Sequence, residues 1–365
     1  MRKESLKFLE QLLDAPSPSG YEQPAQRVFR EYVAPFCDEL TTDVMGNVFG
    51  YISGKGSGKG SAKGKVLPRV MIVGHTDEIG LQIKYIDDKG FLYFAAVGGV
   101  DAHLTPGKRV AVHTAKGALP GVIGKKPIHL MDNKDRETVV KLESQYIDIG
   151  ASDKKEAQKL VRVGDAVTFE SSFTRLQGDR VASRGFDDKA GCFVVAEVLR
   201  LVAASGKKLA VDLYGVSSVQ EEIGLRGGTT SCYTINPDVG ICVEVDFATD
   251  QPDVEKKHNG EVALGKGPIL ARGANINPHL FELLSKTASS EKIAIQHTAT
   301  PRATGTDANV MQISRGGVAT ALVKIPLRYM HTPVETLSLA DLEDAAKLIV
   351  ATLWRITSRE EFIPR

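Results

Sequence analysis

Acidic and histidine side chains follow several apolar segments of this chain, where they could bind a cation and transfer a proton. His75 and Asp77 come directly after the apolar run RVMIVG. Glu221 and Glu222 come after the run VDLYGVSSV. Ionised carboxylates are rarely buried unless they are paired or bound to a cation, so adjacent glutamates at the end of a buried strand need an explanation. The further candidates are Asp187, Asp188, Asp246 and His331.

Each of these side chains alone is more often structural than functional. A lone histidine after a strand is usually a satisfied polar residue, and Asp187-Asp188 before a helix would ordinarily act as its N-cap. Asp246 could simply end a strand. Together they form a set of nitrogen and oxygen ligands with no thiolate, and such a set suits Zn²⁺, Co²⁺ or Mn²⁺.

The elements that must position these residues alternate between strands and helices. Strands are expected at 69–74, 211–219 and 239–246, and each delivers ligand-type side chains at its carboxyl end. Open α/β sheets bind their ligands at that edge. A long helix is expected over 188–205 and a last helix near the end of the chain. The pattern predicts an α/β fold, with a three-layer catalytic domain built on a mixed, mostly parallel sheet.

Residues 80–171 have a different pattern, in which short apolar runs alternate with turn residues. This pattern predicts a small β-rich domain, inserted into a discontinuous catalytic domain of residues 1–79 and 172–365. The segment SGKGSGKGSAKGK (53–65) contains no phosphate-binding motif, and we expect it to form a mobile hairpin tip.

The composition is that of an ordinary globular protein, with 42% hydrophobic and 25% charged residues and a formal net charge of +1 over 365 residues. No apolar run is long enough to span a bilayer, and the balanced charge gives no general attraction to nucleic acid, so neither partner is expected. The N-terminal segment reads as an amphipathic helix and not as a signal peptide. The four cysteines form no C-x-x-C pair, which indicates reduced thiols in a cytoplasmic protein.

The motifs GHTDEIG, RGFDDKAG, VQEEIGLRGG, EVD, GTDA and IPLRYMHTPVE occur in the order found in the tetrahedral (TET) aminopeptidases. The chain resembles this family of dimetal peptidases, which includes glutamyl and deblocking aminopeptidases, over nearly its whole length. Dimetal carboxypeptidases share the order of ligands. However, the interval between Asp246 and His331 leaves little room for the lid domain that they insert there, whereas the interval from His75 to Asp187 can hold a domain.

The resemblance implies a metal-binding role for five residues. Asp187 is expected to bridge two divalent ions, zinc or cobalt with manganese possible. One ion would also bind Glu222 and His331. The other would also bind His75 and Asp246.

The resemblance also implies which residues act beside the metals. Glu221 would be the general base toward a water that bridges the ions, and Asp77 would accept a hydrogen bond from His75 and fix its tautomer. Asp188 would either cap the helix or orient its neighbour, and Asp307 is a candidate for binding the α-ammonium group of the substrate. Adjacent residues on a regular strand point to opposite faces, so both glutamates can face the metals only if the strand bends or ends there.

The expected function is therefore a metal-dependent aminopeptidase that removes N-terminal residues from peptides. An endoglucanase-type glycoside hydrolase, a name given to some relatives, an aspartyl-type aminopeptidase and a non-catalytic shell protein are the alternatives. The glycosidase alternative would not need the histidines, because two carboxylates flanking the bond suffice. By resemblance, the inserted domain is expected to mediate dimerisation within a homo-oligomer, a tetrahedral dodecamer in this family. The sequence does not choose among acidic, basic and neutral first residues.

Overall fold

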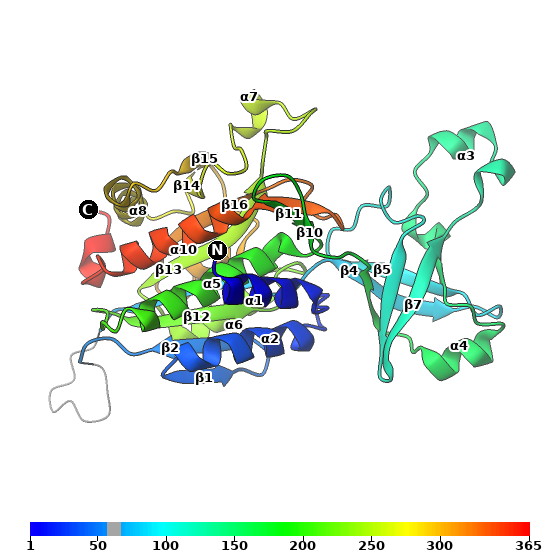
Figure 1. Cartoon of the computed structure of the whole chain (residues 1–365), viewed down its shortest axis with the longest axis horizontal. Helices are drawn as coiled ribbons and strands as arrows, with labels where there is room; N and C mark the ends of the chain where they lie inside the picture. The colour runs from blue at the N-terminus through cyan, green and yellow to red at the C-terminus, as the bar shows by residue number, and fades with distance from the viewer. Residues whose placement is uncertain (57–66) are drawn as a thin grey trace.

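Helices cover both faces of a mixed β-sheet in the computed structural model, which describes residues 1–56 and 67–365 (Figure 1). The strand order is β1-β2-β12-β3-β13-β16-β14-β15. The four central strands β12, β3, β13 and β16 are parallel to one another, and the pair β14–β15 is also parallel. The strands of this sheet are β1 (Glu39–Thr42), β2 (Val48–Ile52), β3 (Arg69–His75), β12 (Asp212–Ser218), β13 (Val239–Phe247), β14 (Ile269–Gly273), β15 (Gln296–Thr300) and β16 (Ala319–Leu327).

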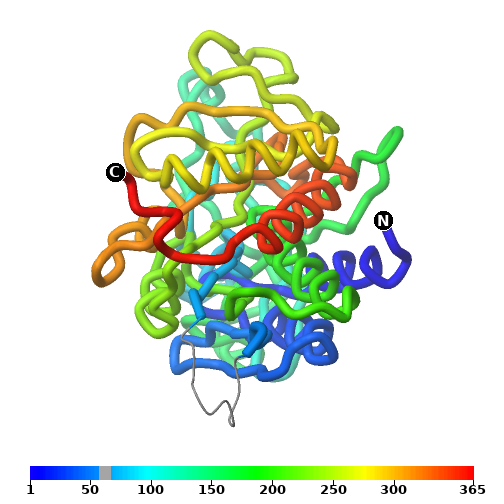
Figure 2. The backbone as a smooth tube through the Cα atoms, turned by 90° about the vertical axis from the view of Figure 1, so that its left-hand side faces the viewer, coloured from blue at the N-terminus to red at the C-terminus, as the bar shows by residue number. Residues whose placement is uncertain are grey.

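The helices form two layers, one on each face of the sheet. Figure 2 shows α10 between α5 and α8, and all three contact the same face of the sheet. This layer comprises α1 (Lys3–Asp14), α2 (Gln23–Val33), α5 (Phe186–Ala204), α8 (Pro278–Glu291) and α10 (Leu339–Leu353). The opposite layer comprises α6 (Arg226–Ile235) and α9 (Asp307–Gln312). These layers confirm the predicted three-layer α/β fold.

The sequence explains why these elements form. β3 and β13 are near-continuous apolar runs because helices bury them on both faces. α1 is amphipathic and buries Leu9, Leu12 and Leu13 against the core, as its spacing predicts. Ser338 occupies the N-cap position of α10, but its hydroxyl donates to Asp179 and not to the backbone of the helix.

The predicted β-rich region forms a closed barrel with the strand order β4-β5-β8-β7-β6-β9, which projects from the sheet domain in Figure 1. Its core contains Leu81, Ile83, Val110, Val112 and Val167. The strands are β4 (Gly80–Ile86), β5 (Leu92–Val97), β6 (Arg109–Thr114), β7 (Gly117–Gly124), β8 (Tyr146–Asp148) and β9 (Ala166–Phe169), with helices α3 (Asn133–Glu137) and α4 (Lys154–Leu160). The domain boundaries given by the sequence stay a prediction.

A small antiparallel sheet, β10-β11-β17, follows the barrel along the chain. Its strands are β10 (Thr174–Arg175), β11 (Arg180–Ser183) and β17 (Glu335–Ser338). The remaining short helices are η1 (Ala34–Phe36), η2 (Ile128–Leu130), η3 (Leu142–Ser144), α7 (Lys256–Asn259) and η4 (Arg359–Phe362).

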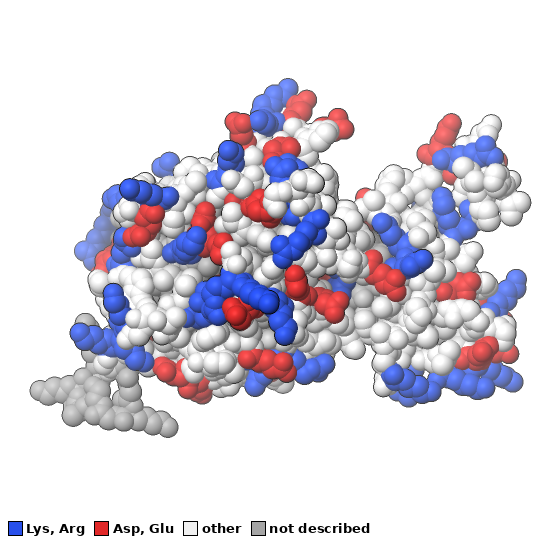
Figure 3. Space-filling view, in the orientation of Figure 1, with Lys and Arg blue, Asp and Glu red and all other residues white. Residues whose placement is uncertain are grey.

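Acidic and basic side chains are interspersed over the face of the molecule shown in Figure 3. Among the described residues, no helix is long and apolar enough to cross a membrane. The hairpin tip predicted over 53–65 falls largely outside the described residues.

Candidate functional site

The predicted ligands come together at the carboxyl edge of the four central strands. His75 is the last residue of β3, and Glu221 and Glu222 follow β12. Asp187 lies at the start of α5, and His331 lies in the loop after β16. Because parallel strands end at the same edge of a sheet, residues far apart in the chain meet there.

Asp187 lies between two histidines. Its Oδ1 atom is 3.2 Å from Nε2 of His75, and its Oδ2 atom is 3.3 Å from Nε2 of His331. Burial raises the pKa of Asp187, but the two histidine side chains outweigh this effect and hold the pKa well below its ordinary value. A carboxylate with one oxygen beside each histidine is positioned to bridge two cations.

Further carboxylates complete each half of the cluster. Glu222 Oε1 is 3.5 Å from Nε2 of His331. On the other side, Glu244 Oε2 and Glu221 Oε2 are 3.6 and 3.7 Å from Nε2 of His75. Ligand atoms about 2.0 to 2.1 Å from a tetrahedral ion are about 3.4 Å from one another. The separations of Glu222 and Glu244 from the two histidines therefore suit ligands that share a cation, and Glu221 lies outside both groups of potential ligands.

Both histidines turn Nε2 toward this centre, because Nδ1 has another partner. Nδ1 of His75 is 3.0 Å from the backbone oxygen of Asp77 and 3.4 Å from its Oδ1. Nδ1 of His331 is 3.0 Å from the backbone oxygen of Gly99. A proton on each Nδ1, donated to these oxygens, leaves the Nε2 lone pairs available for metal binding.

Asp77 also holds the two glutamates in place. Its Oδ1 accepts from the backbone N–H of Glu221 and its Oδ2 from that of Glu222, at 3.0 and 3.1 Å. The hydroxyl of Ser19 donates to Oδ2 at 2.7 Å. β12 ends at Ser218, and Gln220 has a left-handed φ of 56°, so the alternation of a regular strand no longer applies at the two glutamates.

The structure does not bring Asp246 to the centre as the sequence predicts. Oδ2 of Asp246 forms an ion pair with Lys324, and Oδ1 accepts from the backbone N–H of Phe247. Glu244, two residues earlier on the same face of β13, occupies the expected position instead. The pairing of β13 with β3 explains this position. Cys242 lies opposite Val73, so Glu244, two residues later, lies beside His75 at the end of β3.

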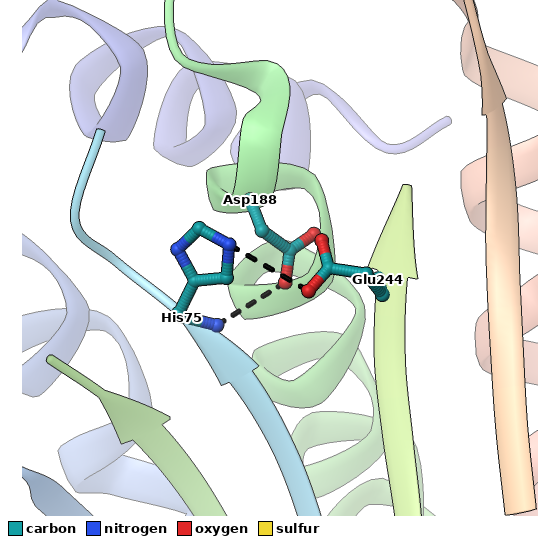
Figure 4. Close-up of side chains that lie close together, drawn as sticks. All are labelled: His75, Asp188 and Glu244. Atoms are coloured by element: carbon teal, nitrogen blue, oxygen red, sulfur yellow. Dashed lines mark hydrogen bonds and ion pairs between the residues drawn. The ribbon is translucent and has the colours of Figure 1, made fainter. Parts of the chain in front are cut away.

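Asp188 is within reach of His75 and Glu244, and the three could hold a cation (Figure 4). However, Oδ2 of Asp188 accepts from the backbone N–H of His75 at 3.1 Å, and Oδ1 accepts from that of Gly191 at 2.9 Å. Because both oxygens already accept from backbone donors, we favour Asp187 as the shared ligand. Asp188 caps the regular part of α5 and fixes the end of β3.

Sequence reasoning missed Glu335, a buried residue that joins the start of α5 to the loop that carries His331. Its Oε2 accepts from the backbone N–H of Asp187 at 3.0 Å, and its Oε1 accepts from that of His331 at 2.9 Å. Burial, followed by the nearby Asp187 charge, raises the pKa of Glu335 well above its ordinary value. Glu335 is the last residue of the motif IPLRYMHTPVE, and only that proximity to His331 could have indicated its role.

The charges of the cluster fit a cation centre. Burial and then the Asp187 charge raise the pKa of Glu222 to about 9, and burial is also the main cause that raises the pKa of Glu221 to about 9. Oε1 of Glu222 is buried with no hydrogen-bond partner among the described residues. Buried carboxylates without a compensating cation are costly, so this orphaned oxygen and its acidic neighbours fit bound divalent ions.

A cavity of about 660 Å³ opens onto the cluster and is lined by residues of β13, β15 and β16 and the loops that follow them. Asp307, predicted to bind the substrate ammonium, is 1% exposed and is not among the lining residues. Its Oδ2 accepts from the Ser218 hydroxyl at 2.7 Å, and burial raises the pKa of Asp307 to about 6. The structure therefore places the Asp307 carboxylate behind the cavity wall.

Comparison with known proteins agrees with this geometry. The family described as M42 glutamyl aminopeptidase matches residues 56–348. The chain belongs to this family. This M42 protein is 38% identical over 349 residues to a lysyl aminopeptidase of Pyrococcus furiosus, a match that covers 95% of this chain and 96% of the relative.

Solved structures give the same result. A TET aminopeptidase from a marine sediment archaeon of the Thaumarchaeota has a TM-score of 0.91 and 33% identity, covering 99% of this chain and all of that one. A Pyrococcus horikoshii TET1 peptidase, described as assembling into a tetrahedron or a large octahedral shell, has a TM-score of 0.84 and 31% identity, covering 96% of this chain and 100% of that one. The predicted resemblance to TET aminopeptidases is therefore confirmed, and this M42 protein is a peptide hydrolase of the aminopeptidase class. The glycoside hydrolase alternative is not better supported, because a Thermotoga maritima structure described as an endoglucanase matches with a lower TM-score of 0.75 and 29% identity.

Proposed function

We propose that this aminopeptidase depends on two divalent cations that share Asp187. His75 and Glu244 would complete one site, and Glu222 and His331 would complete the other. The observation that carries the proposal is the position of Asp187, with one oxygen beside Nε2 of each histidine. This assignment replaces Asp246 by Glu244 in the predicted ligand set.

The two cations would supply a water of lowered pKa and polarise the scissile carbonyl. Glu221 is proposed as the general base, since its backbone is held by Asp77 and its carboxylate faces the same space. Its Oε2 atom would take a proton from the attacking water and deliver it to the leaving amine. The backbone N–H groups of Glu222 and Asp187 donate to Asp77 and Glu335, respectively, and these hydrogen bonds position both residues beside Glu221.

The donor set of imidazoles and carboxylates supports zinc or cobalt, with manganese as a further candidate. Free peptides would be the substrates, because the cavity is open at the surface and of small-molecule size. Which group binds the substrate ammonium stays open, and the burial of Asp307 does not support the prediction for that residue.

We also propose that the chain forms a dimer-based homo-oligomer through its barrel, with twelve subunits as the complete particle. The support is the tetrahedron named for the Pyrococcus horikoshii relative and the dodecamer named for a further TET1 structure, which match this chain with TM-scores of 0.84 and 0.83. The four free cysteines, three of them buried, support a cytoplasmic location, where thiols stay reduced. Sedimentation velocity measures the assembly directly.

The test of the proposed function is hydrolysis of aminoacyl p-nitroanilides after EDTA treatment and again after addition of Zn²⁺, Co²⁺ or Mn²⁺. We expect EDTA to abolish hydrolysis and at least one cation to restore it. An N-acetylated substrate is the control, because it lacks the free amine and should not be cleaved. Undiminished hydrolysis by the metal-free protein would exclude the proposal.

A further inference from the structure

The cavity wall beyond the cation centre carries a single pair of opposite charges among the described residues. Apart from the acidic and histidine residues of the centre, the charged side chains that line the cavity are Asp246 and Lys324. They form an ion pair through Oδ2 and Nζ. The side chain of Lys324 is 10% exposed and that of Asp246 is 21% exposed, so both are largely buried but reach the cavity.

The backbone fixes the place of this pair. β13 and β16 are parallel neighbours, and Glu244 lies opposite Lys324 in their register. The Lys324 ammonium group nevertheless pairs with Asp246, which lies two residues after Glu244 on β13 and outside the cation centre. Asp246 has a second donor, the backbone N–H of Phe247 at 2.9 Å. Within residues 1–56 and 67–365, the ion pair is the one interaction that the structure shows for the Lys324 ammonium group.

The rest of the wall is uncharged. Leu322 and Met330 provide apolar surface, and Thr298, Thr304 and Asn259 provide hydroxyl and amide groups. A charged first side chain of a substrate would therefore lose water and find its opposite charge already paired. An uncharged side chain would lose no such hydration and would leave the pair intact.

We propose that the Asp246–Lys324 pair sets the preference of the enzyme for the first residue of its substrate and selects uncharged side chains. The inference rests on the proposed function, since it places the first side chain in the cavity beside the cation centre. It also predicts how the preference can be reversed. Removing one member of the pair leaves the other available to a substrate of opposite charge.

The experiment compares kcat/KM for the Leu, Met, Lys and Glu p-nitroanilides in four proteins: wild type, Asp246→Asn, Lys324→Met and the double variant. In wild type, we expect the Leu and Met substrates to exceed Lys and Glu by at least tenfold. Lys324→Met should raise the Lys/Leu ratio at least tenfold, and Asp246→Asn should raise the Glu/Leu ratio at least tenfold. The double variant should return to a preference for uncharged residues.

The neighbouring ion pair of Arg328 and Asp250 provides a matched control. It lies just beyond the ends of the same two strands and has similar exposure, 16% and 22%, but neither residue lines the cavity. Asp250→Asn should leave both substrate ratios unchanged. Cation content, measured by mass spectrometry, and melting temperature are recorded for every variant to show that folding and the cation centre are intact.

Several outcomes would overturn the inference. One is a wild-type preference for Lys or Glu, and another is a single variant that changes all substrates by the same factor. Loss of a bound cation in Asp246→Asn would mean that Asp246 is a ligand, contrary to the inference. If the substrate ratios do not move while hydrolysis stays sensitive to EDTA, this inference fails alone. If wild type hydrolyses none of the substrates with any cation, the proposed function fails with it.

Discussion

Replacement of Glu244 by Gln should remove one of the two cation sites, whereas replacement of Asp246 by Asn should remove neither. Glu244 Oε2 is 3.6 Å from Nε2 of His75, close to the distance of about 3.4 Å between two ligand atoms of a tetrahedral cation. Gln keeps the shape of this side chain but removes its charge. Asp246 is paired with Lys324 outside the centre, so its replacement by Asn should leave every proposed cation ligand in place.

The expected size of the effect follows from the number of ligands. The cation beside His75 would have three protein ligands, and Glu244→Gln weakens one of them. Loss of a residue that only orients a ligand lowers metal affinity by about 10- to 100-fold, so loss of a charged ligand should cost at least about 100-fold. At about 1.4 kcal/mol per tenfold, a 100-fold loss of affinity is about 2.8 kcal/mol for one site.

The assay is titration of the EDTA-treated protein with Zn²⁺ in a calorimeter, with a competing chelator to bring tight binding into range. Wild type and Asp246→Asn should bind two equivalents per chain. Glu244→Gln should bind one equivalent tightly and a second at least 100-fold more weakly. Two tight equivalents in Glu244→Gln, together with the loss of one in Asp246→Asn, would show that the ligand assignment is wrong and that the sequence-based prediction was right.

Three further predictions concern other buried acids. Glu221→Gln should lower kcat at least about 100-fold, the size of a general-base effect, with both cations still bound by mass spectrometry; a parallel loss of cations would contradict its role as the base. Glu335→Gln should lower Zn²⁺ affinity by about 10- to 100-fold, measured by competition with a chelator. Each carboxylate oxygen of Glu335 accepts from one backbone N–H, and the amide nitrogen of Gln cannot accept. Unchanged affinity would show that Glu335 does not position the ligands. Burial raises the pKa of Glu78, but Arg184 and Lys189 outweigh this and hold it at about 2, below the ordinary 4.5. The contribution of ionised Glu78 to the free energy of unfolding is therefore fully present above about pH 4.5 and is lost as the pH falls toward 2. In denaturant titrations, Glu78→Gln should lower the free energy of unfolding of the metal-free protein by about 3 kcal/mol at pH 7 and by less at pH 3. Equal losses at both pH values would refute this prediction.

Much of the fold could be predicted because its signals are local. Apolar runs of strand length alternate with amphipathic helical segments, and this alternation is enough to indicate an α/β sheet with helices on both faces. The change of pattern after Ile79 indicates a separate β-rich unit, and the structure shows a barrel whose strands run from Gly80 to Phe169. The closure of these strands into a barrel could not be predicted, because it depends on pairing between strands that are far apart in the sequence.

The candidate site shows the same division between local and long-range information. His75, Asp187 and His331 could be selected from the sequence because each follows a strand or begins a helix. The choice between Glu244 and Asp246 could not be made in this way, because both lie on the same face of β13, and only the pairing of that strand with β3 distinguishes them. Glu335 was missed for a related reason, since its contacts are with the backbone of residues that are distant in sequence or lie in an irregular loop.

The acidic centre should also connect cation binding to stability. Glu221, Glu222 and Glu244 are buried beside Asp187, and burial raises the pKa of each of these glutamates. Folding without cations must therefore bring several carboxylates out of water, at a cost that protonation only partly removes. Cations that bind the folded centre but not the unfolded chain recover this cost and add to the free energy of unfolding. The same buried carboxylates that suit the centre to binding cations should therefore lower the stability of the metal-free protein.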